Sequence, residues 1–369
     1  MIKISVSASK KYDVVMNKGL LSMAGMYIKD ALGLKDDPLT GTLKDKKICI
    51  VTDATVAPLY GEKDHKLYQS LKKSGFEVYR YIFPGGEDYK NISIIEEILE
   101  FLASKQFTRS DLLLALGGGI AGDVTGFAAA SYLRGIDYIQ VPTTLLAVVD
   151  SSVGGKTGVN LKAGKNLAGA FWQPSLVLFD SDVLSTLSHE LKLDGIAEAI
   201  KAGVIADKFI LDSINKKHSL NEPDFLTNLA SLAIEVKKKV VEEDERDNGS
   251  RQLLNFGHTL AHAIEKCSQY KISHGHAVAM GMAIVSIASD RLGWTLEKCS
   301  EEIVDILHRF GFPLKCPFSP WELAEAAKQD KKIRGGNITL VIPAAIGKCR
   351  LKTIPVSKLE QFISYGING

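Results

Sequence analysis

Short β-type runs alternate with helical runs through the first half of the chain, and this alternation constrains the fold more than any other feature. Between the runs, apolar residues recur every three or four positions, as in amphipathic helices. Strands joined by helical crossovers form a parallel sheet, which binds ligands at the carboxyl ends of its strands. The sequence therefore predicts an N-terminal α/β domain. The strand-like runs are Ile48–Val51, Val78–Phe83, Leu112–Leu116, Tyr138–Val141 and Leu176–Phe179.

Beyond about residue 184 the apolar residues follow a helical period with little strand between the helices. Because 369 residues exceed what one hydrophobic core usually organises, we expect two domains: an α/β domain over residues 1–183 and a mainly helical domain over residues 184–369. The helical patterns are Leu187–Ile205, Phe225–Val241, Gln252–Lys266, Ala277–Leu292 and Ser300–Phe310. A hairpin of Ile338–Ile342 with Lys348–Ile354 and a helix over Ser357–Ile363 are expected near the end.

The charge balance gives no general reason to expect nucleic acid or an anionic membrane as a partner, since 45 basic residues face 43 acidic ones. No stretch offers about 18 uncharged apolar residues, and the first residues lack the apolar core of a leader peptide. The five cysteines are scattered and odd in number, which is typical of thiols in a reducing compartment. We therefore expect a cytoplasmic protein without a membrane span.

A glycine-rich turn, Gly117–Asp123, follows the apolar run Leu112–Leu116 directly and leads into a helical pattern. Glycines let the backbone approach a pyrophosphate, and a helix N-terminus offers N–H groups and partial positive charge. The order strand, glycine turn and helix predicts binding of NAD or another nucleotide. A tight structural turn is the alternative, because the spacing is neither G-x-G-x-x-G nor a P-loop. Asp53, at the end of the first run, could accept a ribose hydroxyl or serve only as a turn residue.

Histidines gather in the helical half, where four of the eight lie between positions 258 and 276. His258 and His262 are four residues apart, so they share a helix face, and this spacing favours them as a pair of metal ligands. His274 and His276 precede the next helical pattern, and Glu198 lies upstream in GIAEAIK. Imidazole and carboxylate form a zinc-type ligand set that leaves a position open for substrate. For any single histidine, a hydrogen-bonded core or surface residue is favoured over a metal ligand, whereas the clustering of four within twenty residues favours a metal site for the group.

Basic residues accompany these sites and predict a phosphate or carboxylate substrate. Lys156 and Lys165 lie in stretches rich in glycine and asparagine, outside any amphipathic helix. In the run Lys237–Lys239, a solvated helix face is expected for at least two of the three lysines. The other basic residues of this set are Lys201, Arg251, Lys331 and Lys332.

Six long motifs, in order from about Lys46 to Pro343, closely resemble those of the 3-dehydroquinate synthase family in the sugar phosphate cyclase superfamily. They read GGGIAGDVTGFAAASYLRG, IQVPTTLLAVVDSSVGGKTGVN, GKNLAGAFWQP, GIAEAIKAG, RQLLNFGHT and HGHAVAMGM. Such a series is more specific than a single glycine loop. The resemblance implies a Rossmann-like NAD domain followed by a helical metal-binding domain, an active site in the cleft between them, and a homodimer.

The same resemblance implies roles for individual residues. A divalent metal, zinc with cobalt as the alternative, is bound by Glu198, His258 and His274, and His262 faces the substrate phosphate. The residues implied around NAD are Asp53, Glu87, Lys90, Gly119, Gly122, Asp123, Thr143, Thr144, Lys165 and Thr186. Those implied near the phosphate are Lys156, Asn166, Asn255 and Lys332, with Arg134 contributed by the partner subunit. Lys237 and Arg251 are implied to hold the substrate carboxylate, and Asp150 and Lys201 to line the cavity.

The reaction implied by the resemblance belongs to the shikimate pathway of aromatic amino acid synthesis, and its substrate is 3-deoxy-D-arabino-heptulosonate 7-phosphate. A secondary hydroxyl is oxidised transiently by NAD beside the metal. The ketone acidifies the neighbouring C–H, so phosphate leaves by β-elimination while basic residues stabilise its charge. Hydride return, ring opening and an intramolecular aldol step give 3-dehydroquinate, and NAD is not consumed.

Three positions depart from the family pattern. Ser188 stands where a proline is common, and we expect only a local effect on the backbone there. His276 stands where glutamate is usual, so we expect it to alter the metal electrostatics or to compete as a ligand. Ala261 replaces a usual glycine.

Three other functions are open to the chain. A related cyclase for sugar phosphates without a carboxylate is disfavoured by Lys237 and Arg251. A polyol or glycerol dehydrogenase would release NADH and lacks the combination of SSVGGKTG with NFGHT. A non-catalytic nucleotide-binding protein would not need the metal and basic positions.

Overall fold

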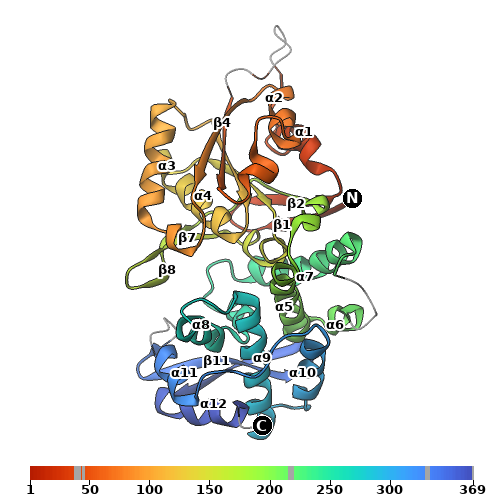
Figure 1. Cartoon of the computed structure of the whole chain (residues 1–369), viewed down its shortest axis with the longest axis vertical. Helices are drawn as coiled ribbons and strands as arrows, with labels where there is room; N and C mark the ends of the chain where they lie inside the picture. Colours follow the sequence, from red (N-terminus) through yellow and green to blue (C-terminus); the bar gives the residue numbers. More distant parts are fainter. Residues whose placement is uncertain (37–42, 44–45, 215–219, 329–332, 368–369) are drawn as a thin grey trace. The chain divides into compact units, whose positions relative to one another are not determined.

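The computed structural model describes residues 1–36, 43, 46–214, 220–328 and 333–367 (Figure 1). The chain divides into two compact units, Met1–Leu187 and Ser188–Gly369.

The first unit is built on a sheet with the strand order β1-β2-β9-β6-β5-β3-β4. Every neighbouring pair from β2 to β4 is parallel, and only β1 pairs antiparallel with its neighbour β2. The parallel α/β sheet predicted from the alternating runs is therefore confirmed. The structure also shows an antiparallel edge strand, β1, which lies outside those runs. The strands are β1 (Ile2–Ser7), β2 (Lys11–Asn17), β3 (Lys47–Asp53), β4 (Glu77–Phe83), β5 (Leu112–Gly117), β6 (Asp137–Pro142) and β9 (Leu176–Asp180).

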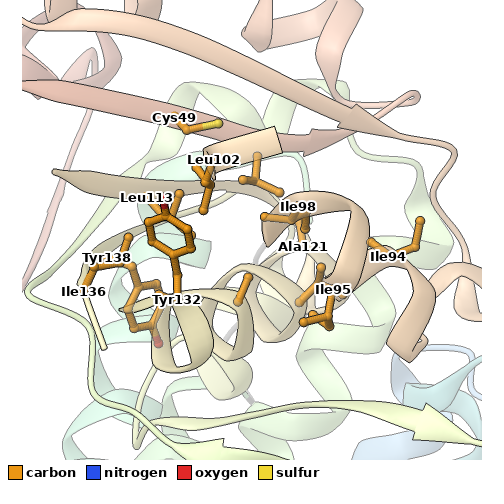
Figure 2. Packing of buried hydrophobic residues seen from close by; sticks show 14 of the residues in the cluster. Cys49, Ile94, Ile95, Ile98, Leu102, Leu113, Ala121, Tyr132, Ile136 and Tyr138 are labelled. Carbon is orange, nitrogen blue, oxygen red and sulfur yellow. The ribbon is translucent and has the colours of Figure 1, made fainter. Parts of the chain in front are cut away.

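Helices α3 (Ile92–Ser104) and α4 (Gly119–Ser131) bury apolar side chains against the sheet, and this cluster forms part of the core of the first unit (Figure 2). Ile94, Ile98 and Leu102 recur at four-residue spacing, so they line one face of α3. A fully buried side chain of this size stabilises the fold by about 1.5–3 kcal/mol. The core thereby holds the glycine turn at the carboxyl end of β5. Two further helices of this unit are α1 (Ala24–Ala31) and α2 (Lys66–Lys73).

A two-stranded hairpin, β7 (Lys156–Leu161) with β8 (Gly164–Phe171), also belongs to the first unit and was not predicted. Glycine is depleted in strands, and this stretch is rich in it, so local propensity concealed the hairpin. A Cβ on Gly158 would lie 2.5 Å from the carbonyl oxygen of Ala168. The glycines therefore permit the close approach of the two strands.

The second unit is mainly helical, as expected, and it also contains a small sheet with the order β10-β11-β12. Strands β11 (Asn337–Ala345) and β12 (Lys348–Pro355) form the predicted hairpin. The helices are α5 (His189–Ala206), α6 (Lys208–Ile214), α7 (Pro223–Glu243), α8 (His258–Cys267), α9 (His274–Arg291), α10 (Ser300–Arg309), α11 (Pro320–Ala327) and α12 (Leu359–Ile367), and β10 spans Ile333–Arg334. Among the described residues, no helix has the length and apolar character that a membrane crossing requires.

The predicted helix over Gln252–Lys266 is wrong in its first half. Residues Ser250–Asn255 form a 3₁₀ turn, and α8 begins only at His258. Gly257 interrupts the helix because its φ of 77° is left-handed, and a Cβ there would lie 2.9 Å from the backbone nitrogen of Met282. The next helix, α9, begins at His274 and not at Ala277. Both histidines are therefore first residues of helices.

Candidate metal centre and nucleotide-binding site

Three helices of the second unit bring together a cluster of possible metal ligands. Glu198 comes from α5, and His258 and His274 open α8 and α9. One ligand atom from each lies within 4.8 Å of the other two. The Oε1 atom of Glu198 is 3.5 Å from Nε2 of His258 and 3.4 Å from Nε2 of His274.

These spacings fit a tetrahedral metal ion. Oxygen and nitrogen ligands lie about 2.0–2.2 Å from zinc, so two of them at tetrahedral corners are about 3.3–3.6 Å apart. Both distances from Glu198 fall in that interval. Three protein ligands would leave a coordination position for substrate, as in catalytic sites.

Neighbouring groups orient both imidazoles. The Nδ1 atom of His258 is 3.1 Å from the carbonyl oxygen of Phe256, and Nδ1 of His274 is 3.6 Å from Oε2 of Glu265. Occupying Nδ1 in this way directs Nε2 toward the metal position, an arrangement typical of histidine ligands. The second carboxylate oxygen of Glu198, Oε2, pairs with the buried ammonium of Lys201.

The electrostatics of the cluster favour a cation. Burial, assisted by Lys201, holds the pKa of His258 well below its usual value, so this imidazole is neutral and available as a ligand. Burial also lowers the pKa of His274, but hydrogen bonds and charge interactions with Glu198 and Glu265 outweigh it and raise that pKa to about 10. The two carboxylates therefore favour a positive charge at this place, and a bound metal ion would displace the second proton of His274.

His262 lies beside this cluster and outside the ligand set. Its ring centroid is 5.8 Å from that of His258, and the planes are nearly perpendicular at 86°. Among the described residues, the group of ligand atoms that converge contains His274 and not His262. The i, i+4 spacing alone had favoured the other pairing.

Both residues that were predicted to bind the substrate carboxylate are buried cations of the second unit. Lys237 on α7 is 7% exposed, and Arg251 in the 3₁₀ turn is 1% exposed. In the same lysine run, Lys239 is exposed and Lys238 is half-buried. The solvated helix face expected for at least two of the three lysines therefore does not include Lys237. The Arg251 guanidinium donates to the carbonyl oxygen of Glu245. Asn255 donates to the carbonyl oxygen of Gln252, while Lys332 lies outside the described residues.

In the first unit, the glycine turn joins β5 to α4 as predicted. Gly117 has a left-handed φ of 154°, and a Cβ on it would lie 3.4 Å from Oδ2 of Asp53. A Cβ on Gly119 would lie 3.0 Å from Oγ of Ser151, and one on Gly122 would lie 2.7 Å from Oε1 of Gln140. Close packing therefore explains part of the glycine content. The α4 N-terminus remains a suitable position for a phosphate, as its N-cap residue has no side chain to compete for the N–H groups.

A polar network beside this turn connects several residues predicted to surround NAD. The buried Lys90 ammonium donates to Asp123 at 2.6 Å and to Asn166 at 2.7 Å. A second carboxylate, Glu87, accepts from Asn160 at 2.8 Å and lies 3.7 Å from Nζ of Lys165. The hairpin β7–β8 is thereby tied to the segment that follows β4.

The remaining predicted residues of this unit lie in turns, except Lys156, which begins a strand. Thr143 donates its N–H to Gly117, and the Thr144 hydroxyl accepts from Ala147. The hydroxyl of Thr186 is 2.7 Å from that of Tyr60. Asp150 lies in the turn Ala147–Ser151, Lys156 is an exposed residue at the start of β7, and Arg134 is exposed with a left-handed φ of 68°.

Comparison with known proteins identifies the family. Residues 80–193 match the model of the 3-dehydroquinate synthase N-terminal domain, and residues 195–333 match that of the C-terminal domain. A 3-dehydroquinate synthase of Streptococcus sanguinis is 40% identical over 359 residues, covering 95% of this chain and 96% of the relative. The chain belongs to the 3-dehydroquinate synthase family.

Two similar solved structures contain NAD⁺ and a divalent metal ion. A 2-deoxy-scyllo-inosose synthase complexed with carbaglucose-6-phosphate, NAD⁺ and Co²⁺ is 26% identical with a TM-score of 0.86, covering 99% of this chain and 100% of its own. A 2-epi-5-epi-valiolone synthase from Streptomyces hygroscopicus with NAD⁺ and Zn²⁺ bound is also 26% identical, with a TM-score of 0.83 and 98% coverage of both chains.

The three departures from the family pattern have different surroundings. Ser188 is the N-cap residue of α5, and its hydroxyl accepts from the backbone N–H of Leu191. Nε2 of His276 is 3.1 Å from Oε2 of Glu190, and its Nδ1 is 3.3 Å from Oδ1 of Asp194. The converging ligand set among the described residues does not include His276, so the structure gives no support for its competing as a ligand. Ala261 is fully buried on α8, and its backbone nitrogen would lie 3.2 Å from a Cβ on Gly281 of α9. The methyl group of Ala261 is accommodated in this packing.

Sequence reasoning missed two acidic residues beside the metal cluster. Glu265 contacts His274, and it lies seven residues after His258, two turns along the same face of α8. Asp194 lies four residues before Glu198 on α5 and contacts the start of α9. Helical spacing from a proposed ligand would have selected both residues.

Proposed function

We propose that this chain catalyses the conversion of 3-deoxy-D-arabino-heptulosonate 7-phosphate to 3-dehydroquinate and phosphate, as a carbon–oxygen lyase. The observation that carries the proposal is the convergence of Glu198, His258 and His274 in a member of the 3-dehydroquinate synthase family. The rest of the predicted site supports it with buried cations suited to an anionic substrate.

The proposed cofactors are NAD and a divalent metal, with zinc as the metal. Support comes from the ligand spacing and from the cofactors in the two related cyclases. When bound, the metal supplies a Lewis acid and NAD supplies a hydride acceptor that returns the hydride within the same cycle.

The side chains of this protein would bind and orient the substrate. Glu198, His258 and His274 would hold the metal, and the buried ammonium of Lys201 pairs with the Glu198 carboxylate from α5 itself. Lys237 and Arg251 would bind the substrate carboxylate, because a guanidinium matches its two oxygens. This pair favours the heptulosonate over sugar phosphates that lack a carboxylate.

The phosphate would be bound by the remaining basic and amide residues. We assign His262 and Asn255 to this role, with Lys332, Lys156 and Asn166 as further candidates. Cations and N–H donors near the phosphate stabilise the charge that develops as it leaves.

The protein is also proposed to act as a homodimer in which Arg134 is offered to the partner subunit. Leu133 and Arg134 both adopt left-handed φ angles, 50° and 68°, and both are exposed. Such angles are uncommon in residues other than glycine and often occur at functional sites.

Product analysis tests the proposal. The protein with substrate and a small amount of NAD should form 3-dehydroquinate, identified by NMR, in large excess over NAD. Accumulation of NADH in step with substrate loss would indicate a dehydrogenase and would contradict the proposal.

A matched pair of lysine variants tests the assignment of the substrate carboxylate. Lys237→Met should raise KM about ten- to a hundredfold, since a hydrogen bond to a charged group contributes about 1.5–3 kcal/mol. Lys239→Met, an exposed position in the same run, should leave KM unchanged. Equal effects of the two substitutions would contradict the assignment.

A further inference from the structure

The N-terminus of α9 is capped by a residue of another helix. Its N-cap residue, Ser273, makes no side-chain hydrogen bond to the backbone of its own helix. Instead, Oδ1 of Asp194 on α5 accepts from the backbone N–H of Gly275 at 3.0 Å and from the Ser273 hydroxyl at 2.6 Å. A carboxylate at this position satisfies a helix N–H group and interacts favourably with the helix dipole.

A third group of α9 converges on the same oxygen. Nδ1 of His276 is 3.3 Å from Oδ1 of Asp194 and 2.7 Å from the Ser273 hydroxyl. The Asp194 side chain is only 8% exposed. One buried carboxylate therefore connects α5 to the whole first turn of α9.

The backbones of α5 and α9 touch at this point. A Cβ on Gly275 would lie 2.3 Å from Cα of Asp194, so a glycine is required for the contact. His274 directly precedes Gly275, and Glu198 lies one helical turn after Asp194. The contact is therefore adjacent to the pair His274–Glu198, whose ligand atoms are 3.4 Å apart.

We propose that Asp194 is a positioning residue for the metal centre. It holds the first turn of α9 against α5 at the spacing in which His274 and Glu198 bind one divalent cation. Asp194 acts through hydrogen bonds and does not ligate the metal. The inference rests on the proposed function only in requiring a metal at Glu198, His258 and His274.

Cobalt binding by the metal-free protein tests this inference. Co²⁺ is titrated while its visible absorption is recorded, which reports both affinity and coordination geometry. Asp194→Ala should weaken Co²⁺ binding about ten- to a hundredfold, an effect of the size seen when residues outside the ligand set are lost, because the first turn of α9 would no longer hold His274 in place. Asp194→Asn keeps an oxygen acceptor, so it should restore most of the affinity and the wild-type spectrum.

Asp290 provides a matched control. Its Oδ2 atom, in the last turn of α9, accepts from the backbone N–H groups of Cys299 at 3.2 Å and Ser300 at 2.9 Å, and so caps α10 in the same way. Asp290→Ala should lower the unfolding temperature without changing Co²⁺ affinity.

Wild-type affinity and spectrum in Asp194→Ala would overturn the inference, while phosphate release by the wild-type protein would leave the proposed function intact. If Asp194→Ala does not fold, the Co²⁺ affinity of Ser273→Ala tests the inference instead. Loss of the hydrogen bond from Ser273 to Asp194 should lower this affinity about threefold or more, and an unchanged affinity would overturn the inference. A wild-type protein that binds no Co²⁺ would contradict both the inference and the proposed metal centre.

Discussion

The histidines of α8 and α9 lie close together, yet the proposed function gives them different tasks. His258 and His274 direct Nε2 to the same oxygen of Glu198, whereas the ring of His262 stands beside His258. Residue spacing could predict that a metal site was present, because carboxylate and imidazole recur in one region. It could not select the ligands, because the separation of α8 from α9 depends on tertiary packing at glycines such as Gly257 and Gly281.

Two histidine variants separate these tasks. His274→Ala should remove bound metal, because two ligands remain where three converge. His262→Ala should keep the metal and reduce turnover about a hundredfold or more, as expected for loss of a residue acting on substrate. Metal content by mass spectrometry and phosphate release measure the two effects. Loss of metal from both variants would restore the pairing of His258 with His262.

At the scale of elements, the strands and helices with clear periodicity were predictable, and those governed by glycine were not. The apolar run Leu112–Leu116 is typical of a buried strand, and the apolar residues of Ile92–Ser104 recur at helical spacing along one face. The hairpin β7–β8 and the break before His258 depend on close backbone contacts, which local propensity does not encode. Both missed features carry residues that the resemblance assigns to the site.

One turn in the second unit permits a prediction at this scale. After α7, the carboxylate of Asp244 accepts from the backbone N–H groups of Asn248 at 3.0 Å, Gly249 at 2.6 Å and Arg251 at 3.1 Å. The Asp244 side chain therefore shapes the turn that presents Arg251. Asp244→Ala should raise KM about tenfold through a displaced guanidinium, with metal content unchanged. An unchanged KM would show that Arg251 is positioned without this turn.

The same carboxylate gives a pH dependence with a defined sign. Burial raises the pKa of Asp244, but the hydrogen bonds from Asn248, Gly249 and Arg251 outweigh it and hold the pKa below its usual value. Its stabilising contribution is therefore complete above about pH 4 and is lost as the pH falls through the lower folded-state pKa. Thermal unfolding of the wild type and of Asp244→Asn should differ most near neutral pH and converge on acidification. A difference that grows as the pH falls would contradict this assignment.

At the scale of the whole molecule, the two units contribute different chemistry. The first carries the glycine turn and the network of Lys90, Asp123 and Asn166, and the second carries the metal cluster and the buried cations. The division into an α/β part and a helical part was readable from the change of period near residue 184. Residue spacing alone could not select the metal ligands of the second part, because they come from three separate helices, and only the resemblance to the family implied this set.

Phosphate release from 3-deoxy-D-arabino-heptulosonate 7-phosphate is the most direct test of the proposed function. It is measured with a catalytic amount of NAD before chelation, after chelation, and after zinc is returned. We expect phosphate in large excess over NAD, loss of release on chelation, and recovery with zinc. Absence of phosphate release from the intact protein, or release that persists after complete removal of the metal, would contradict a metal-dependent 3-dehydroquinate synthase.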